Sequence, residues 1–162
     1  VLVGSGSPLS VVTPAYVGQL YSDTAQTNGA RLWVATTTAS SGWQVAVGDT
    51  GWRNVSGLLE GDATKTADDI VSIRRVGNIV EFVRGVNFPS WVSGATFITV
   101  PIGFRHARLL YLPPCYQNSD PITLVHTTGA MKRYATGSGT RRLSWAWTTS
   151  QAWPTTLPGT AV

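Results

Sequence analysis

Any hydrolytic or metal chemistry in this chain would have to be built from its eight carboxylates, Asp23, Asp49, Glu60, Asp62, Asp68, Asp69, Glu81 and Asp120. Glycosidase chemistry usually needs two carboxyl groups about 5–10 Å apart around the bond that is cleaved. Four of the eight fall within residues 60–69, which read as a loop, so solvated charge is the expected role there. Hard oxygen donors could also hold Ca²⁺, but no EF-hand-like spacing is present. We expect no catalytic pair and no metal site in the chain, while a pair assembled across protomers stays open.

The other candidates for metal binding or nucleophilic catalysis are His106, His126 and Cys115. A zinc site needs three or four converging ligands, and these residues show no metal-ligand spacing. Each histidine is expected at a strand end, and Cys115 is expected as a buried, unreactive thiol in its apolar Leu-Pro-Pro setting. The chain also lacks a glycine-rich phosphate loop before a helix and a Gly-x-Ser-x-Gly elbow. The sequence therefore predicts a protein that is not an enzyme and needs no cofactor.

Aromatic and polar residues in the second half of the chain indicate a sugar-binding surface instead. The apolar C–H faces of sugars stack on Trp and Tyr, while Asp, Asn, Gln and Arg bind hydroxyl and anionic groups. Residues 116–121 are the most polar irregular stretch, and loops on a rigid scaffold are where binding residues concentrate. The predicted ligand-binding residues are Trp91, Tyr116, Gln117, Asn118, Asp120, His126, Arg133, Arg141 and Trp153. For Trp91 and Tyr116, packing or a subunit contact is an equally open alternative.

Charge is sparse and unevenly distributed along the chain. Charged residues make up 12%, about half the usual share, and Ser, Thr and Gly supply polarity that suits strands and turns. Residues 1–81 carry a net charge of −2 and residues 82–162 carry +6. No nucleic-acid motif accompanies the basic half, so an anionic glycan or phosphate-rich wall polymer is preferred over nucleic acid as its partner. No apolar run has membrane-spanning length, so no membrane insertion is expected.

Short segments with period-two alternation follow one another from Tyr16 onward. Strands are expected at 16–22, 31–36, 43–47, 70–76, 79–87, 96–100, 107–112, 122–126, 130–135 and 141–147. Trp145 and Trp147 share one face of the last strand and are expected in the core. Gly77-Asn78 predicts a two-residue hairpin turn, and residues 55–62 allow one helical turn at most. The pattern predicts an all-β protein, an antiparallel β-sandwich of jelly-roll type.

A change of character near Asp49 divides the chain. Residues 1–14 predict an extended arm or linker, residues 15–48 a small β-hairpin module, and residues 49–162 the β-sandwich head. At the boundary, Asp49-Thr50-Gly51 predicts a turn in which the Asp side chain accepts a backbone N–H, and Trp52 is expected as a buried sheet anchor. Residues 154–162 are expected to form a wrapped tail on a neighbouring subunit.

Two stretches of the chain resemble bacteriophage tail proteins. The first, PAYVGQLYSDT at residues 14–24 with LWVAT at 32–36 and SGWQV at 41–45, resembles the small β-modules of phage fibres and minor tail proteins. The second, DTGWRNV at 49–55 followed by IRRVGNIV at 73–80 and VPIGFR at 100–105, is similar to C-terminal domains of tail proteins from phages of actinobacteria and other Gram-positive hosts. The resemblance implies a homotrimer with a β-sandwich head that attaches to host-surface saccharide. Residues 106–162 follow no such pattern and are where we expect the host-specific surface.

These observations lead to a receptor-binding domain at a phage tail, baseplate or fibre tip. It would bind host cell-wall or surface polysaccharide through weak contacts multiplied by the copies in a trimer, and upstream phage segments would precede it because the chain begins with Val rather than Met. A structural phage protein, such as a head fibre, decoration protein or assembly tip, is the alternative, with the same trimer but no aromatic pocket. A carbohydrate-binding module would be a monomer with a Trp platform or groove, and an enzyme would require convergent carboxylates or a metal.

Overall fold

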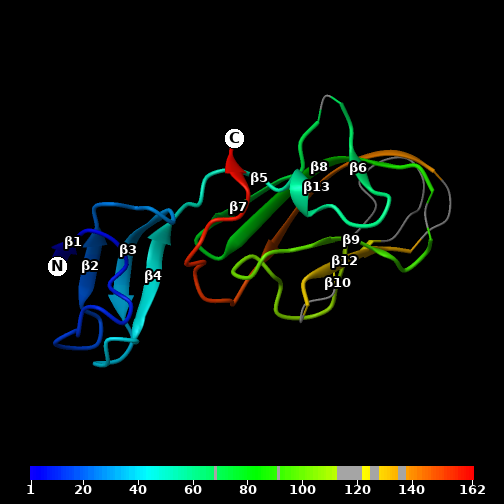
Figure 1. Cartoon of the computed structure of the whole chain (residues 1–162). Coiled ribbons are helices and arrows are strands. Elements are labelled where there is room, and N and C mark those ends of the chain that lie inside the picture. The colour runs from blue at the N-terminus through cyan, green and yellow to red at the C-terminus, as the bar shows by residue number, and fades with distance from the viewer. Residues whose placement is uncertain (68, 91, 113–121, 125–127, 135–137) are drawn as a thin grey trace.

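The computed structural model describes the chain except residues 68, 91, 113–121, 125–127 and 135–137, and describes only the backbone of 122–124, 141 and 143. The described residues form strands and turns, with one 3-10 turn, η1 (Ser56–Leu58), as their helical element. Figure 1 shows an N-terminal sheet beside a larger body, with the C-terminus close to β5 at their junction. The all-β prediction is confirmed, and the helical turn falls inside residues 55–62 as expected. The jelly-roll type stays a prediction.

The N-terminal sheet contains, in this order, β1 (Leu2–Gly4), β2 (Leu20–Asp23), β3 (Ala30–Ala35) and β4 (Trp43–Gly48). Strands β2, β3 and β4 pair in antiparallel fashion. Their alternation buries Tyr21, Trp33 and Trp43 in one cluster, because successive residues of a strand point to opposite faces. The rings of Tyr21 and Trp43 meet edge to face with their centroids 5.9 Å apart, an arrangement that aromatic quadrupoles favour.

Residues 1–14, predicted as an extended arm or linker, contact the N-terminal sheet. Strand β1 pairs in parallel with β2 and extends the sheet. The Gly6 N–H donates to Asp23 Oδ1 at 2.8 Å, and the Trp43 indole N–H donates to the Val12 carbonyl at 2.7 Å. The arm is therefore bound to the module along its length. A three-residue strand whose partner lies far along the chain has too little periodicity to be recognised in the sequence.

The larger body consists of two sheets. One contains β5 (Arg53–Asn54), β6 (Thr64–Lys65), β7 (Ser72–Val76), β8 (Ile79–Phe88), β13 (Gly139–Thr148) and β14 (Thr160–Ala161), in the order β13-β8-β7-β5-β14 with β6 also beside β8. The other contains β9 (Thr96–Thr99), β10 (Leu110–Leu112), β11 (Ile122–Leu124) and β12 (Ala130–Arg133), in the order β10-β11-β12-β9. All ten predicted strands overlap observed ones, while the short strands β1, β5, β6 and β14 escape prediction.

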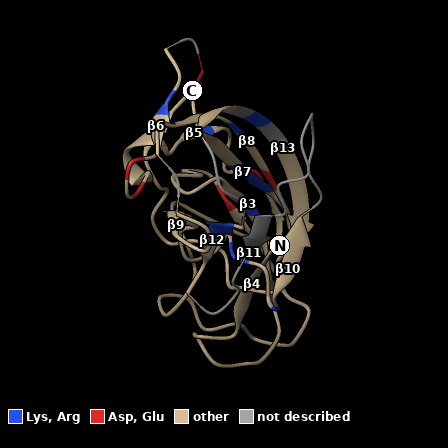
Figure 2. Cartoon of the chain, turned by 90° about the vertical axis from the view of Figure 1, so that its right-hand side faces the viewer, with Lys and Arg blue, Asp and Glu red and all other residues tan. Residues whose placement is uncertain are grey.

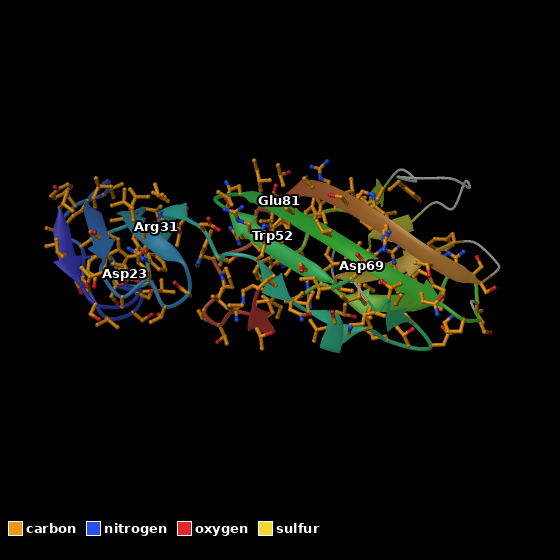
Figure 3. All side chains as sticks on the ribbon, turned by 90° about the horizontal axis from the view of Figure 1, so that it is seen from above. Asp23, Arg31, Trp52, Asp69 and Glu81 are labelled. Carbon is orange, nitrogen blue, oxygen red and sulfur yellow. The ribbon has the colours of Figure 1, made fainter. Side chains whose placement is uncertain are left out.

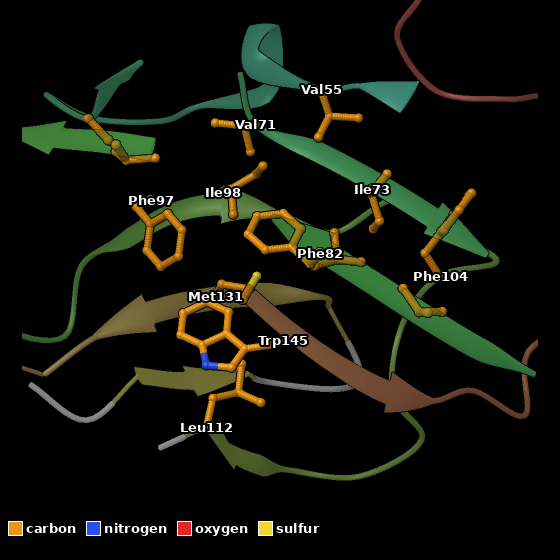
Figure 4. Packing of buried hydrophobic residues seen from close by; sticks show 14 of the residues in the cluster. Val55, Val71, Ile73, Phe82, Phe97, Ile98, Phe104, Leu112, Met131 and Trp145 are labelled. Atoms are coloured by element: carbon orange, nitrogen blue, oxygen red, sulfur yellow. The ribbon is translucent and has the colours of Figure 1, made fainter. Parts of the chain in front are cut away.

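The core of the body contains buried residues from both sheets (Figure 4). Its members include Val55, Val71, Ile73, Phe82, Phe97, Ile98, Phe104, Leu112, Met131, Trp145 and Trp147. The predicted burial of Trp145 and Trp147 is confirmed. The indole N–H of Trp147 donates to the Phe104 carbonyl at 2.8 Å, so burial leaves this polar group satisfied.

The predicted Gly77-Asn78 hairpin is confirmed. Val76 faces Ile79 across the turn, and Gly77 has a φ of +55°, a conformation that glycine adopts without steric cost. Strand β8 then pairs with β13 over ten residues of each strand. The hairpin therefore supplies the long central strand on which the six-stranded sheet is built.

The predicted turn at Asp49 is also confirmed. The Gly51 N–H donates to Asp49 Oδ1 at 2.8 Å, and the Arg74 Nε donates to the same oxygen at 2.9 Å. The Arg74 guanidinium therefore holds the pKa of Asp49 below its ordinary value, and the Gly51 hydrogen bond acts in the same direction. Trp52 is not the buried anchor that the sequence predicts. It is half-buried in the connection before β5, because the chain there passes between modules before it enters a sheet.

We expect Asp49→Asn to lower the free energy of unfolding at pH 7 by roughly 1 kcal/mol or less, since the ion pair is partly exposed. The folded state lowers this pKa, so the stabilisation is present above the unfolded value near pH 4 and disappears as the pH falls through the folded value. Urea unfolding of both proteins at pH 7 and pH 2.5 tests this. A stability difference of the same size at both pH values would contradict the prediction.

Candidate functional site

The structure separates the predicted binding residues into three groups. Trp91, Tyr116, Gln117, Asn118, Asp120 and His126 lie outside the described residues. Arg141 is described by its backbone, which lies on β13 opposite Val86. Arg133 and Trp153 are described in full, and both are buried. Neither of these two side chains is open to a saccharide in this structure.

Arg133 lies on the inner face of β12 with its guanidinium carbon 5.0 Å from the centroid of the Phe88 ring. Arg84 of β8 is also buried, with its guanidinium carbon 4.3 Å from the Phe97 ring. Aromatic faces attract such cations electrostatically. Among the basic side chains of the second half that the structure describes, these two lie inside the sandwich, so the positive charge available on the surface is smaller than the sequence suggests.

Trp153 lies in the junction between the N-terminal sheet and the larger body. Its indole N–H donates to the Asn28 carbonyl at 2.9 Å, and its ring stacks under Arg75 at 4.8 Å from the guanidinium carbon. A Cβ on Gly48 would come within 2.7 Å of the ring, so glycine is what allows the ring to lie there. The sequence places Trp153 before a proline near the end of the chain, which reads as an exposed loop. In the fold, this segment instead lies in the junction between the N-terminal sheet and the larger body.

The C-terminal segment continues along its own chain after Trp153. Strand β14 pairs with β5, and the Arg53 Nε donates to the Pro158 carbonyl at 3.0 Å. The sequence predicts that residues 154–162 pack on a neighbouring subunit. In the single chain they close the edge of the six-stranded sheet beside β5.

The outer face of the β10-β11-β12-β9 sheet carries one open tyrosine, Tyr111, and a second open tyrosine, Tyr134, directly follows β12. We call this surface the tyrosine face and define it by Thr96, Thr99, Tyr111, Lys132 and Tyr134. Tyr111 is aligned through β11 with Lys132, and Lys132 is paired with Thr96, so the three lie in one row across the sheet. The side chain of Tyr111 is 69% exposed and that of Tyr134 is 44% exposed. Tyr111 offers its aromatic ring to solvent from strand β10, whereas Tyr134 does so from the residue that directly follows β12.

Alternation along β10 and β12 produces the tyrosine face. Leu112 and Met131 point into the core, which turns Tyr111 and Lys132 outward. Tyr134 follows two residues after Lys132, and its Cε1 would be 3.6 Å from a Cβ on Gly94, an ordinary contact distance. The N–H of Gly94 donates to the Arg133 carbonyl at 2.8 Å and holds this part of the chain against β12.

Acidic groups lie along the β9 side of the tyrosine face. The Thr99 hydroxyl donates to Glu60 Oε1 at 2.6 Å, and the Glu60 N–H donates to the Phe97 carbonyl at 2.9 Å. Asp62 accepts a hydrogen bond from the Ser90 N–H at 2.8 Å. Figure 2 shows acidic positions in red near β6 and β9. The face thus combines open aromatic rings, hydroxyls, an ammonium group and a neighbouring carboxylate, which is the mixture that binds sugars.

Other carboxylates lie in different parts of the molecule, where they form hydrogen bonds or ion pairs within the fold (Figure 3). Asp23 Oδ1 accepts backbone N–H groups at the end of β2. Asp69 binds the Arg142 guanidinium at 2.8 Å, and this hydrogen bond lowers its pKa. Glu81 Oε2 lies 3.9 Å from Arg74 Nη1. Within the described ranges, no group of three or more His, Cys, Asp or Glu side chains could hold a metal ion.

Sequence reasoning did not identify Tyr111, Lys132 or Tyr134 as site residues, although a signal was present. Both tyrosines lie in segments that the sequence predicts as strands, at 107–112 and 130–135. Alternation within the second segment places Lys132 and Tyr134 on the face opposite Met131. The sequence could not reveal that β9, β10 and β12 belong to one sheet, because that depends on pairing between distant segments.

Comparison with protein-family models and with curated proteins finds no match to the chain. In the part of the chain that the structure describes, no helix has the length and apolar character to cross a bilayer.

Proposed function

We propose that the chain is the receptor-binding domain of a phage tail, baseplate or fibre protein and attaches the virion to host cell-surface saccharide without catalysis. The tyrosine face is the observation that carries this proposal. An exposed tyrosine on the sheet and another directly after β12 can stack on the apolar faces of sugars, and the neighbouring hydroxyl, ammonium and carboxylate groups can bind sugar hydroxyls. The sheet holds these groups in place before binding, which reduces the entropy cost of association.

The phage setting is supported by the resemblance of residues 14–105 to tail and fibre proteins. The same resemblance supports a homotrimer, upstream tail segments as partners, and a place on the virion. Three copies of the tyrosine face would convert weak contacts into avid attachment to a repetitive polysaccharide. The proposal therefore needs only modest affinity at each face.

We expect Tyr111→Ser and Tyr134→Ser each to weaken binding to host cell walls by about tenfold, because each removes one stacking surface. The measurement is binding of purified protein to walls from a panel of Gram-positive bacteria, with the molecular mass determined by light scattering in the same buffer. Tyr16→Ser is the matched control, since Tyr16 is 58% exposed but lies before the N-terminal strand β2. Wall binding that survives both face substitutions would refute this site.

A structural phage protein without saccharide binding is the second candidate. It is favoured by the outer face of the six-stranded sheet, where Val83 is exposed beside Ser144 and Ile79 is exposed beside Thr148. Exposed apolar side chains on a sheet face suit packing against another subunit. This candidate predicts a trimer that binds no wall material from any host in the panel, whereas a monomer that binds walls would indicate a carbohydrate-binding module.

A further inference from the structure

We propose that the tyrosine face takes an acidic oligosaccharide longer than one sugar residue, with Lys132 binding a carboxylate or phosphate group between two stacked rings. The inference rests on the proposed function and names the ligand class of the same site. Three observations carry it: the separation of the two tyrosines, the lack of an ion-pair partner for Lys132 among the described residues, and the position of the acidic residues.

The separation of the tyrosines sets the length of the ligand. Tyr111 lies two strands away from Lys132, and Tyr134 lies two residues beyond Lys132 along the chain. Standard sheet geometry gives about 10 Å for the first separation, and two residues of chain span at most about 7 Å for the second. A single sugar ring is similar in size to one tyrosine ring and cannot cover both. A ligand that stacks on both tyrosines therefore contains more than one sugar residue and passes over Lys132.

The state of Lys132 sets the charge of the ligand. Its side chain is half-buried, and no carboxylate among the described residues forms an ion pair with it. An ammonium group in such a position gains more from an anion than a fully hydrated surface lysine does. Lysine binds phosphate and carboxylate as a compact charge with three donors.

The acidic residues set the position of the anionic group. Glu60 is attached to the β9 edge through Thr99, and Asp62 lies in the same loop. Like charges repel, so a carboxylate or phosphate on the ligand is directed away from β9 and toward the row between Lys132 and Tyr111. A neutral saccharide would have no electrostatic preference for either end of this row.

The test uses calorimetry with two named probe series. The first contains galacturonate oligomers of one to six units and the same oligomers with their carboxyl groups reduced to alcohols. The second is a phosphate-bearing polysaccharide extracted from Gram-positive cell walls, before and after removal of its phosphate. We expect acidic oligomers to bind at least about tenfold more tightly than their neutral counterparts, and more tightly than the single acidic sugar. The series that shows this preference distinguishes carboxylate from phosphate.

Lys65 provides a matched control, because Lys65 and Lys132 are the only lysines in the chain. Lys132→Met should abolish the preference for acidic over neutral forms, Lys132→Arg should retain most of it, and Lys65→Met should leave it unchanged. In the wild-type protein, the acidic probe should protect Lys132 from acetylation while Lys65 reacts at its usual rate, as read by peptide mass spectrometry. This second readout does not depend on the folding of any variant.

The outcomes separate this inference from the proposed function. Equal binding of acidic and neutral forms, or a preference that Lys132→Met retains, would overturn the inference and leave saccharide attachment intact. Equal affinity for one sugar residue and for longer oligomers would also overturn it. A folded protein that binds neither probe series, nor the walls in the panel, would remove the proposed function together with the inference.

Discussion

Trp153→Ala is expected to lower the free energy of unfolding by about 3–5 kcal/mol, the range for removing a buried tryptophan. The ring is 9% exposed and belongs to the core cluster of the N-terminal sheet, although it lies near the other end of the sequence. Its loss removes the stacking partner of Arg75 and leaves the Asn28 carbonyl without the indole donor. A loss of this size is a large part of the 5–15 kcal/mol that typically stabilises a domain.

The substitution should also uncouple the two parts of the chain. Asn28 donates from its side chain to the Pro154 carbonyl at 3.0 Å, so the C-terminal segment contacts the N-terminal sheet through both residues 153 and 154. Without the ring, we expect the N-terminal sheet to unfold at a lower urea concentration than the body. The free energy of each of these two transitions should depend less steeply on urea than that of the single wild-type transition, because each exposes less surface. Fluorescence and circular dichroism should then give different midpoints.

Trp52→Ala is the control for this prediction, because Trp52 is a half-buried tryptophan in the connection between the two parts. Trp52→Ala should lower the free energy of unfolding clearly less than Trp153→Ala does. If Trp153→Ala costs less than about 1 kcal/mol and unfolding remains a single transition, then the junction does not depend on this ring.

Arg75→Met is the second large effect, with an expected cost of about 3 kcal/mol or more. The buried guanidinium donates to four carbonyl groups, those of Gly77, Gly103, Gln151 and Ala152. Methionine keeps much of the apolar stem but removes every one of these donors. Burial lowers the pKa of Arg75 to about 10, so the wild-type side chain is still charged at neutral pH and makes charge-assisted hydrogen bonds.

Arg74→Met is the natural comparison for Arg75→Met. Arg74 is the adjacent residue on β7, but its side chain points to the partly exposed outer face and pairs with Asp49. We expect its substitution to cost no more than about 1 kcal/mol. Equal costs for the two substitutions, measured by urea unfolding at pH 7, would contradict a special role for Arg75.

A double-mutant cycle connects the two large predictions. Arg75 and Trp153 are in contact, so the double variant should lose less stability than the sum of the single variants, by about 0.5–3 kcal/mol. Additive losses would mean that the two side chains stabilise the junction independently.

Much of the strand structure could be predicted from local sequence alone. Alternation in residues 141–147 placed Trp145 and Trp147 in the core, and Gly77-Asn78 located the central hairpin. Such features are determined locally, because a strand has a side-chain period of two and a tight turn needs a residue that tolerates positive φ. The short strands β1 and β5 could not be predicted in this way, because two or three residues carry almost no periodic signal.

The buried arginines show that residue type alone can predict the wrong environment for a side chain. Arg133 was predicted as a polar ligand contact, because charged side chains are rarely buried. In the fold, Arg133 and Arg84 instead lie against the aromatic rings of Phe88 and Phe97 inside the sandwich. Residue type gives the average cost of burial, whereas the actual cost depends on the rings and carbonyl groups that distant segments bring to the side chain.

The sequence by itself determined the all-β class, the principal strands and the residues that alternate toward the core. Only the tertiary structure decided that Trp153 joins the N-terminal sheet to the body, and that Tyr111, Lys132 and Tyr134 share one open face. Strand alternation assigns each residue to one of two faces, but it does not specify which strands become neighbours. That choice depends on contacts between residues far apart in the chain, such as β9 with β12, and these contacts leave no local pattern in the sequence.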